Sequence, residues 1–373
     1  MKPLLKWPGG KGREIAQVYG LIPEYRRYIE PFFGGGALYF HLQPKKACIN
    51  DTAKDLMEFY HMVRTRNGEF RACLTCYAES FQGILDFGRM HATVLMDLFE
   101  LTASDPEAAK EKLTQTMDSW MPAILSLFHY SLVTDEEAFR KELEEDLWDK
   151  LIRTVKNHAK TPFPMDDLVE NLVTGLASGY YLYFRQVYND WQLGRKPLSQ
   201  GQRAANFFFI RENCYGSMFR YNRKGEFNIP YGGMSYNKKD FAAKVETIFQ
   251  PETASLFANT QIYNRDFEEF LETVKPTKDD FLFLDPPYDT EFSEYEGNAF
   301  TKLDQARLAV ALSKTPAKFL LVIKNTPFIE ALYSQGFYIR RFEKRYSYNV
   351  RSRNDRQAEH LIITNYPIPE DGE

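Results

Sequence analysis

Short apolar segments bounded by turn residues recur near both ends of the chain. They lie at 28–30, 47–51, 281–285, 319–323, 337–339 and 360–364. The segments 281–285 and 319–323 are almost continuously apolar, as is typical of a strand covered on both faces. Apolar residues at helical spacing alternate with them over 37–42, 52–65, 304–313 and 327–335. Thr326 as N-cap, Pro327 at the first helical position and Gly336 past the end mark the last helix. The alternation predicts a doubly wound α/β sheet.

The middle of the chain has a different pattern. Residues 90–160 are rich in Ala, Leu, Glu and Lys at helical spacing, with few strand signals, until Pro162 and Pro164 interrupt them. Residues 206–233 are dense in aromatic residues, Asn, Arg and Gly, and within them Arg223-Lys224-Gly225-Glu226 predicts a hairpin turn. We therefore expect one α/β domain that is split by a mostly helical insertion.

The pattern predicts where the two domains begin and end. The α/β domain is expected to comprise 1–60 and 255–373, and the insertion 61–254, with its hairpin near 213–232. The helical segment of about 60–205 matches no motif. It is interpreted as a part that clasps a ligand or forms a dimer, without chemistry of its own.

Composition describes a folded globular protein, with 44% hydrophobic and 15% aromatic residues among 373. No run of eighteen apolar residues exists, and the first residues lack the apolar core of a signal peptide. We expect no membrane segment and a reducing cytoplasm. Four cysteines are too few for a disulfide scaffold, and Cys73-x-x-Cys76 has no second pair, so no metal site is expected.

Charge is distributed unevenly around a net value of −4. Residues 105–150 hold twelve acidic and five basic residues, whereas 340–356 hold seven basic and two acidic ones. The second stretch includes Arg351 and Arg353, and a further basic cluster, 220–224, is interleaved with an aromatic residue. Phosphate binding depends on local cation density. Each cluster alone is usually a solvated surface, but with the chemistry below they predict a DNA footprint.

A glycine-rich turn follows the first apolar segment in Glu30-Pro31-Phe32-Phe33-Gly34-Gly35-Gly36. Glycines let a backbone approach a ligand and tolerate positive φ, although a tight turn without a ligand is as common. The next segment ends in Asn50-Asp51. In dinucleotide-type folds an acidic residue at this point binds ribose hydroxyls, so Asp51 is a candidate cofactor ligand as well as a helix cap.

A second glycine-rich segment, Lys6-Trp7-Pro8-Gly9-Gly10-Lys11-Gly12, invites comparison with a phosphate-binding loop. The required GxxxxGK[ST] spacing and its hydroxyl are absent, because Gly12 follows Lys11. We reject nucleoside triphosphate binding here.

Asp285-Pro286-Pro287-Tyr288 directly follows an apolar segment. Such a tetrapeptide is suited to an amine whose lone pair is delocalised into a ring. Asp285 can accept one amine hydrogen and the Pro286 carbonyl the other, while prolines stiffen the loop. Tyr288 offers a stacking face for a base swung out of a duplex. Alone the tetrapeptide is also compatible with a plain turn, but its combination with the glycine loop and Asp51 favours methyl transfer to an amine.

The order of these motifs resembles the DNA adenine methylase (Dam) family. The similar pieces are KWPGGKG at 6–12, EPFFGGGA at 30–37, NDTAKDL at 50–56, FRYNRKGEFNIPYG at 219–232 and LDPPY at 284–288. The resemblance implies a Rossmann-like S-adenosylmethionine-dependent methyltransferase sheet with an inserted, mostly helical target-recognition domain. It also implies methyl transfer from S-adenosylmethionine to N6 of a flipped-out adenine in double-stranded DNA.

The resemblance further assigns roles to individual residues. Trp7, Lys11, Asp51 and Asp285 would contact the cofactor or lie beside it. Glu30 and the loop with Phe32, Gly34 and Gly36 would line its methionine end. Asp266-Phe267 resembles the segment that holds the cofactor adenine. Asp285, Pro286, Pro287 and Tyr288 would form the catalytic loop.

The resemblance also implies that 213–232 forms a hairpin that enters DNA. Arg220 would read a guanine edge, and Tyr215 would insert into the base stack. Further DNA contacts are expected from Asn222, Arg223, Lys224, Arg351 and Arg353. The resemblance implies GATC or a related site as the target, whereas Gly216-Ser217 and Phe219 differ from the residues of the best-known members.

Several alternatives stay open at this stage. One is N4-cytosine methylation, where the catalytic motif more often begins with Ser; another is N-methylation of RNA or of a protein glutamine. A third is a catalytically silent DNA-binding subunit of a restriction-modification system. The expected partner is double-stranded DNA, with a cognate restriction endonuclease as a candidate and no obligate protein partner. The expected location is the cytoplasm, at the nucleoid.

Overall fold

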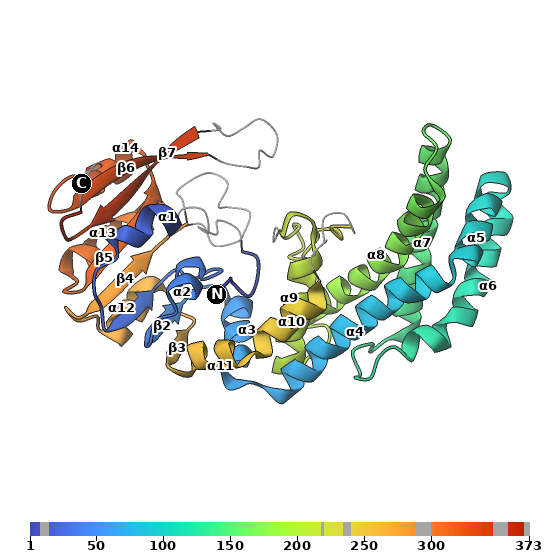
Figure 1. Ribbon diagram of the computed structural model, residues 1–373, viewed down its shortest axis with the longest axis horizontal. Helices are drawn as coiled ribbons and strands as arrows, with labels where there is room; N and C mark the ends of the chain where they lie inside the picture. The colour runs from blue at the N-terminus through green and yellow to red at the C-terminus, as the bar shows by residue number, and fades with distance from the viewer. Residues whose placement is uncertain (8–14, 218–219, 234–239, 288–299, 346–356, 369–373) are drawn as a thin grey trace. The chain divides into compact units, whose positions relative to one another are not determined.

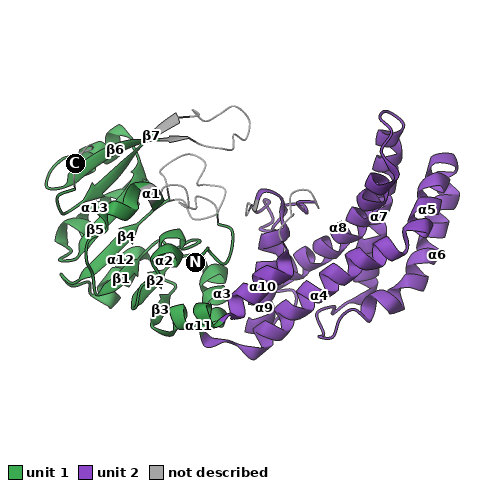
Figure 2. Ribbon diagram, viewed as in Figure 1, with its two compact units in different colours: residues 1–64, 251–373 green, residues 65–250 purple. Residues whose placement is uncertain are grey.

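The computed structural model describes residues 1–7, 15–217, 220–233, 240–287, 300–345 and 357–368. It divides into two compact units (Figure 2). Unit 1 comprises 1–64 and 251–373, and unit 2 comprises 65–250. The sequence predicted divisions at 60/61 and 254/255, close to these.

Unit 1 is built on a seven-stranded sheet (Figure 1). Its strands are β1 (Arg27–Glu30), β2 (Ala47–Asn50), β3 (Thr260–Tyr263), β4 (Asp280–Leu284), β5 (Lys318–Lys324), β6 (Tyr338–Arg345) and β7 (Gln357–Thr364). Their order is β3-β2-β1-β4-β5-β7-β6; β7 pairs antiparallel with both β5 and β6, and the other pairs of described strands are parallel. The predicted α/β fold with a largely parallel sheet is confirmed.

Unit 1 also contains α-helices, several of which pack against its sheet. They are α1 (Ile15–Val18), α2 (Ala37–Leu42), α3 (Lys54–Thr65), α11 (Pro251–Ala258), α12 (Phe267–Val274), α13 (Lys302–Lys314) and α14 (Pro327–Tyr333). Ile29 and Leu282 belong to one hydrophobic cluster with α12 to α14, whereas the rings of the neighbouring Tyr28 and Phe281 pack at a tilt beside Tyr39 of α2. Alternate residues of the central strands therefore meet packed side chains on both faces, which explains why the sequence there is continuously apolar.

The predicted strands are confirmed, but β3 was missed. It is a four-residue edge strand with one buried residue, Thr260, followed by an exposed and two half-buried residues. A strand covered this little needs no run of apolar residues, so it leaves no hydrophobic signal. The helix predicted at 327–335 ends at Tyr333, and its Thr326 cap is confirmed, since Thr326 Oγ1 accepts from Ile329 N at 3.2 Å.

Unit 2 is mostly helical, as predicted. Its helices are α4 (Gly68–Met90), α5 (Ala92–Ser104), α6 (Pro106–Leu125), α7 (Glu136–His158), α8 (Met165–Gln192), α9 (Gln200–Asn213) and α10 (Phe241–Phe249). The predicted turn at 223–226 is present, with Gly225 at φ +76. None of the described helices is long and apolar enough to cross a bilayer.

Glycines on one face of α8 let α7 approach closely. A Cβ added to Gly179 would lie 2.6 Å from Glu142 O and 2.7 Å from Leu143 Cα, and one added to Gly175 would lie 3.1 Å from Leu147 Cα. These contacts are with backbone atoms, which cannot turn aside as a side chain can. The pairing of α7 and α8 therefore depends on these small residues.

We expect Gly179→Ala to lower the free energy of unfolding by about 1–3 kcal/mol, the cost of overpacking a tight contact. The matched control is Gly68→Ala, because a Cβ there has no neighbour within 4 Å. Urea denaturation followed by helical circular dichroism would measure both. Equal stabilities of the two variants would show that the helices can separate without cost.

Candidate active site

The strand order reverses between β1 and β4. From β1 the chain moves outwards through β2 to β3, then returns to the other side of β1 as β4. In open α/β sheets, ligands bind outside the carboxyl ends of strands at such a switch point. Glu30 ends β1, Asp51 follows β2, and Asp285 follows β4. Topology thus brings three predicted site residues to the same edge of the sheet.

The loop after β1 requires its glycines. Gly34 has φ +48 and Gly36 has φ +64, a left-handed conformation that side chains disfavour. A Cβ on Gly34 would lie 2.8 Å from Trp7 Cδ1, and one on Gly36 would lie 2.4 Å from Phe33 Cζ. Trp7 therefore lies against the glycine loop, so the described part of the first glycine-rich segment meets the second one in the fold.

Asp51 organises this loop. Its Oδ2 accepts from Gly34 N at 2.8 Å, and its Oδ1 accepts from Ala53 N at 2.9 Å. Burial raises the pKa of Asp51, while these backbone hydrogen bonds oppose the shift. A carboxylate has about four lone-pair sites, so these backbone hydrogen bonds do not exhaust what Asp51 can accept. Asp51 is thus both a turn residue and a carboxylate with capacity for a ligand.

Asn50 joins three loops, which the sequence did not predict. Its Nδ2 donates to Pro31 O and to Arg265 O, both at 3.0 Å, and its Oδ1 accepts from Arg265 N at 2.9 Å. Asn264 Nδ2 also donates to Asp51 O at 2.8 Å. The loops after β1, β2 and β3 are therefore tied together. The available signal was a buried Asn at the end of an apolar strand.

Glu30 is only 2% exposed. Burial raises the pKa of Glu30 well above its ordinary value. The hydrogen bond that Tyr28 Oη donates to Glu30 at 2.8 Å lowers this pKa, whereas the carboxyls of Asp285 and Asp51 raise it further. The carboxyls of Asp51 and Asp285 therefore act on Glu30 by like-charge repulsion. A cationic ligand is favoured here because it would relieve the repulsion.

The predicted catalytic loop begins directly after β4. Asp285 is half-buried, Pro286 is buried and Pro287 is exposed. The Pro287 carbonyl accepts from Gln305 Nε2 of α13 at 3.1 Å. The predicted residues Tyr288, Lys11, Arg351 and Arg353 lie outside the described residues.

Asp266 and Phe267 begin α12. Asp266 caps the helix by accepting from Glu268 N at 3.0 Å, and its carboxylate pairs with Arg307 at 2.8 Å. Phe267 is buried, lies 5.6 Å from the ring of Phe32 and lies under the Arg307 guanidinium at 4.9 Å. Asp266 and Phe267 thus share a corner with the glycine-loop residue Phe32. Arg307, which holds this corner, was not predicted.

Unit 2 holds the predicted hairpin. Asn222 N donates to Glu226 O at 2.8 Å, and Asn222 Oδ1 accepts from Lys224 N at 2.8 Å. Asn222 therefore shapes the turn, while Arg223 and Lys224 are exposed at its tip. Arg220 is exposed and its Nε donates to Asn228 Oδ1 at 3.2 Å. Tyr215 is 43% exposed.

Helix α8 anchors the hairpin segment. Asn189 Oδ1 accepts from Phe227 N at 2.8 Å while its Nδ2 donates to Phe227 O at 3.1 Å. Tyr181 Oη donates to Ile229 O at 3.0 Å, and the hydroxyls of Tyr188 and Tyr221 are 3.0 Å apart. The anchoring residues recur along one face of α8, so the hairpin has a fixed base. The sequence did not reveal this, because the partners lie about forty residues apart.

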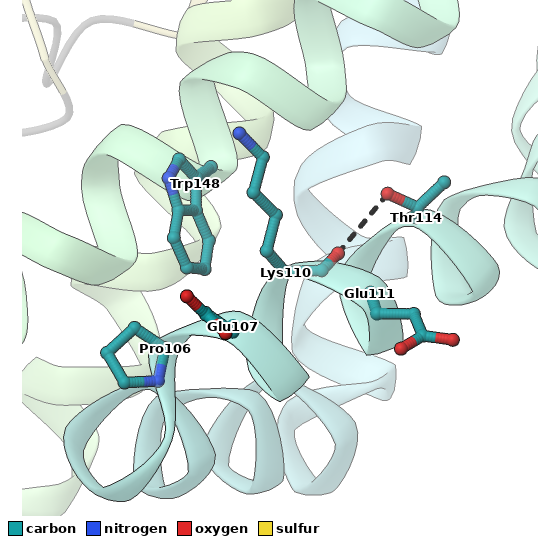
Figure 3. A pocket seen from close by; sticks show the side chains of 6 residues that line it. All are labelled: Pro106, Glu107, Lys110, Glu111, Thr114 and Trp148. Atoms are coloured by element: carbon teal, nitrogen blue, oxygen red, sulfur yellow. Dashed lines mark hydrogen bonds between the residues drawn. The ribbon is translucent and has the colours of Figure 1, made fainter.

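Unit 2 also has a pocket on α6 and α7 (Figure 3). It is lined by Pro106, Glu107, Lys110, Glu111, Thr114 and Trp148. Lys110 Nζ lies 5.7 Å from the centre of the Trp148 ring. An amine above an indole at an open helix surface is an ordinary cation–π contact, and the pocket holds none of the predicted site residues.

Cys73 and Cys76 are both buried on α4. Burial raises the pKa of Cys73 to about 12 and also raises the pKa of Cys76, which disfavours the thiolate form that binds metals. Within the described ranges, no three His, Cys, Asp or Glu side chains gather as metal ligands.

The sequence matches the model of the family described as D12 class N6 adenine-specific DNA methyltransferase over residues 7–83 and 128–348. It is 26% identical to the type II methyltransferase M.CviBI of Paramecium bursaria Chlorella virus NC1A, over 98% of this chain and 100% of that protein. It is 27% identical to the type II methyltransferase M.MjaIII of Methanocaldococcus jannaschii, over 98% and 99%. The DNA adenine methylase of Serratia marcescens is 31% identical, over 83% of this chain and 76% of that protein.

Proposed function

The chain belongs to the D12 class N6 adenine-specific DNA methyltransferase family, and we propose that it transfers a methyl group from S-adenosylmethionine to N6 of a flipped-out adenine at a specific site in double-stranded DNA. The observation that carries this proposal is the meeting of Glu30, Asp51 and the Asp285 loop at the switch point of the sheet. Family membership favours adenine over cytosine as the target and favours an enzyme over a silent subunit.

The described residues fit the cofactor. S-adenosylmethionine carries a sulfonium and an ammonium group, and the site presents the carboxyl of Glu30 within the electrostatic reach of Asp51 and Asp285. Trp7 and the glycine loop would lie against its methionine part, Asp51 would bind the ribose hydroxyls, and Asp266 with Phe267 would hold the adenine. When bound, the cofactor supplies a methyl group that its sulfonium has already activated.

The chain's own residues prepare the accepting amine. Asp285 would accept one N6 hydrogen and the Pro286 carbonyl the other, which localises the nitrogen lone pair. The Asp285 carboxylate would also stabilise the positive charge that develops on the nitrogen. No nucleophilic side chain is required, because positioning and electrostatics suffice for this transfer.

Recognition of DNA is proposed for the hairpin of unit 2, with Arg220 at a guanine edge and Tyr215 in the base stack. Its firm base on α8 supports this, since a side chain that reads a base must be held in place. Arg223, Lys224 and, beyond the described residues, Arg351 and Arg353 would meet phosphates. The proposed target is GATC or a related site, and the proposed place of action is the nucleoid.

Incubation of the protein with radiolabelled S-adenosylmethionine and unmethylated DNA tests the proposal. Label should enter DNA, and digestion to nucleosides should release N6-methyladenine. Label in N4-methylcytosine would correct the target base, and unlabelled DNA would refute the activity. Methylation-sensitive sequencing of the product would then reveal the recognised site.

We expect Arg220→Ala to broaden the methylated motif at one position, since a bidentate guanine contact discriminates by about 1–3 kcal/mol. Arg220→Lys is the matched control for charge: it retains the cation but not the planar pair of donors, so it should broaden the motif as well. Sequencing of methylated sites at equal total methylation measures this. An unchanged motif in both variants would remove Arg220 from base recognition.

For the basic segment 351–356 we expect contacts with phosphates, in contrast to the base contact proposed for Arg220. Arg353→Ala should weaken binding to all sequences without changing the motif, because a phosphate contact carries no sequence information. The slope of log affinity against log salt should flatten by roughly one unit. An altered motif would instead place Arg353 at a base.

A further inference from the structure

Helix α13 carries a polar residue where its apolar stripe should continue. The buried residues of the helix are Gln305, Leu308, Ala309 and Leu312, which follow the i, i+3, i+4, i+7 spacing of a core-facing side. Gln305 is 0% exposed. A residue such as leucine at this position would complete the core. An amide there requires hydrogen bonds, and its presence calls for a reason beyond packing.

Gln305 forms one hydrogen bond to the predicted catalytic loop. Its Nε2 donates to the Pro287 carbonyl at 3.1 Å, while its Oε1 has no hydrogen-bond partner among the described residues. Pro286 and Pro287 have no N–H groups, so carbonyls are the only main-chain groups by which this part of the loop can be held. Gln305 donates a hydrogen bond to one of these carbonyls, that of Pro287, two residues after Asp285.

The start of α13 is itself firmly fixed. Thr301 and Asp304 form a capping box. Arg307 joins α13 to α12, with Nε at 2.9 Å from Glu268 Oε2 and a terminal nitrogen at 2.8 Å from Asp266 Oδ1. A side chain on a helix anchored in this way can hold a loop in one position.

We propose that Gln305 is a positioning residue for methyl transfer: its amide fixes the Pro287 carbonyl and thereby the carboxylate of Asp285 and the carbonyl of Pro286. This inference rests on the proposed function of that loop. Gln305 touches neither the base nor the cofactor in this scheme. It acts through the loop. The buried amide keeps an oxygen without a hydrogen-bond partner among the described residues, a cost that its effect on the catalytic loop would explain.

Gln305→Met separates positioning from packing, because it keeps the length and volume of the side chain but removes the donor. We expect kcat to fall about ten- to a hundredfold, the scale of misplacing reacting groups by up to about 1 Å. The dissociation constant for S-adenosylmethionine and the KM for DNA should stay unchanged, and the melting temperature should be retained or rise. Leu308→Met, on the same buried face, is the matched control and should keep wild-type kcat.

A wild-type kcat in Gln305→Met, beside an active wild-type enzyme, would overturn the inference; a wild-type protein that methylates no adenine would instead refute the proposed function. A second variant tests the inference even if Gln305→Met fails to fold. In Gln305→Glu the introduced carboxyl can donate to the Pro287 carbonyl only while protonated, so kcat should fall with rising pH relative to the wild type. Matching pH profiles of the two enzymes would also overturn the inference.

Discussion

Asp285→Ala is expected to reduce methyl transfer by about three orders of magnitude or more, the scale of losing a positioned polar group that acts on the transition state. The carboxylate both accepts an N6 hydrogen and faces a nitrogen that becomes positive. Asp285→Asn should also be severely impaired, because the amide retains the shape but not the charge. Single-turnover assays with labelled cofactor would measure the rate without interference from product release.

The fold should survive the loss of this carboxylate. Asp285 raises the pKa of the buried Glu30 by like-charge repulsion, so its removal takes away an unfavourable interaction with Glu30. The matched control is Asp279→Ala, which lies before β4, at the other end of the strand, in an exposed pair with Arg26 at 3.9 Å. That variant should keep the full rate. Wild-type turnover in Asp285→Ala would show that the assigned mechanism is wrong.

The central part of the fold could be predicted because burial on both faces leaves a continuous apolar signal. β4 and β5 are such strands, and their positions follow directly from the hydrophobic pattern. β3 lacked that signal because it is an edge strand. The order of the strands was a different matter: alternation of strands and helices indicates a doubly wound sheet but does not say which strands are neighbours.

Some residues of the site could likewise be predicted from the sequence, and others could not. Glu30, Asp51 and Asp285 were recognisable since each stands at the end of an apolar segment, within a motif that resembles a family. Asn50 and Gln305 act on partners that lie far away in the sequence or in another element, such as Arg265 and Pro287. No local pattern encodes such a pairing. Gln305 left one trace, a polar residue on an apolar helical face, and its meaning required the structure.

The hairpin shows the same limit in unit 2. Its turn was predictable from Arg223-Lys224-Gly225-Glu226, because a glycine at positive φ closes it. Asn222 was expected to contact DNA, yet its side chain oxygen accepts from Lys224 N and Glu226 N within the turn. The anchoring of the hairpin by Asn189 belongs to α8, whose role the sequence did not reveal.

Asp51→Ala is expected to weaken S-adenosylmethionine binding by about 1.5–3 kcal/mol, the worth of hydrogen bonds to a charged group. Isothermal titration calorimetry would measure the loss, which corresponds to roughly ten- to 150-fold in affinity. The variant should also lose stability without the cofactor, because the Gly34 and Ala53 N–H groups each lose an acceptor at 2.8 and 2.9 Å. The Asp51 carboxylate is thus expected to bind the cofactor and also to stabilise the fold, and an experiment must separate these two effects.

Thr326→Ala supplies that separation within unit 1. Thr326 caps α14 by accepting from Ile329 N and is not among the proposed cofactor residues. Its loss should lower the free energy of unfolding by about 1 kcal/mol, as for other N-caps, and leave cofactor affinity unchanged. If Asp51→Ala behaves in the same way, losing stability but not affinity, then Asp51 only shapes the loop. If affinity falls only in Asp51→Ala, the loss belongs to the cofactor site and not to a general loss of stability.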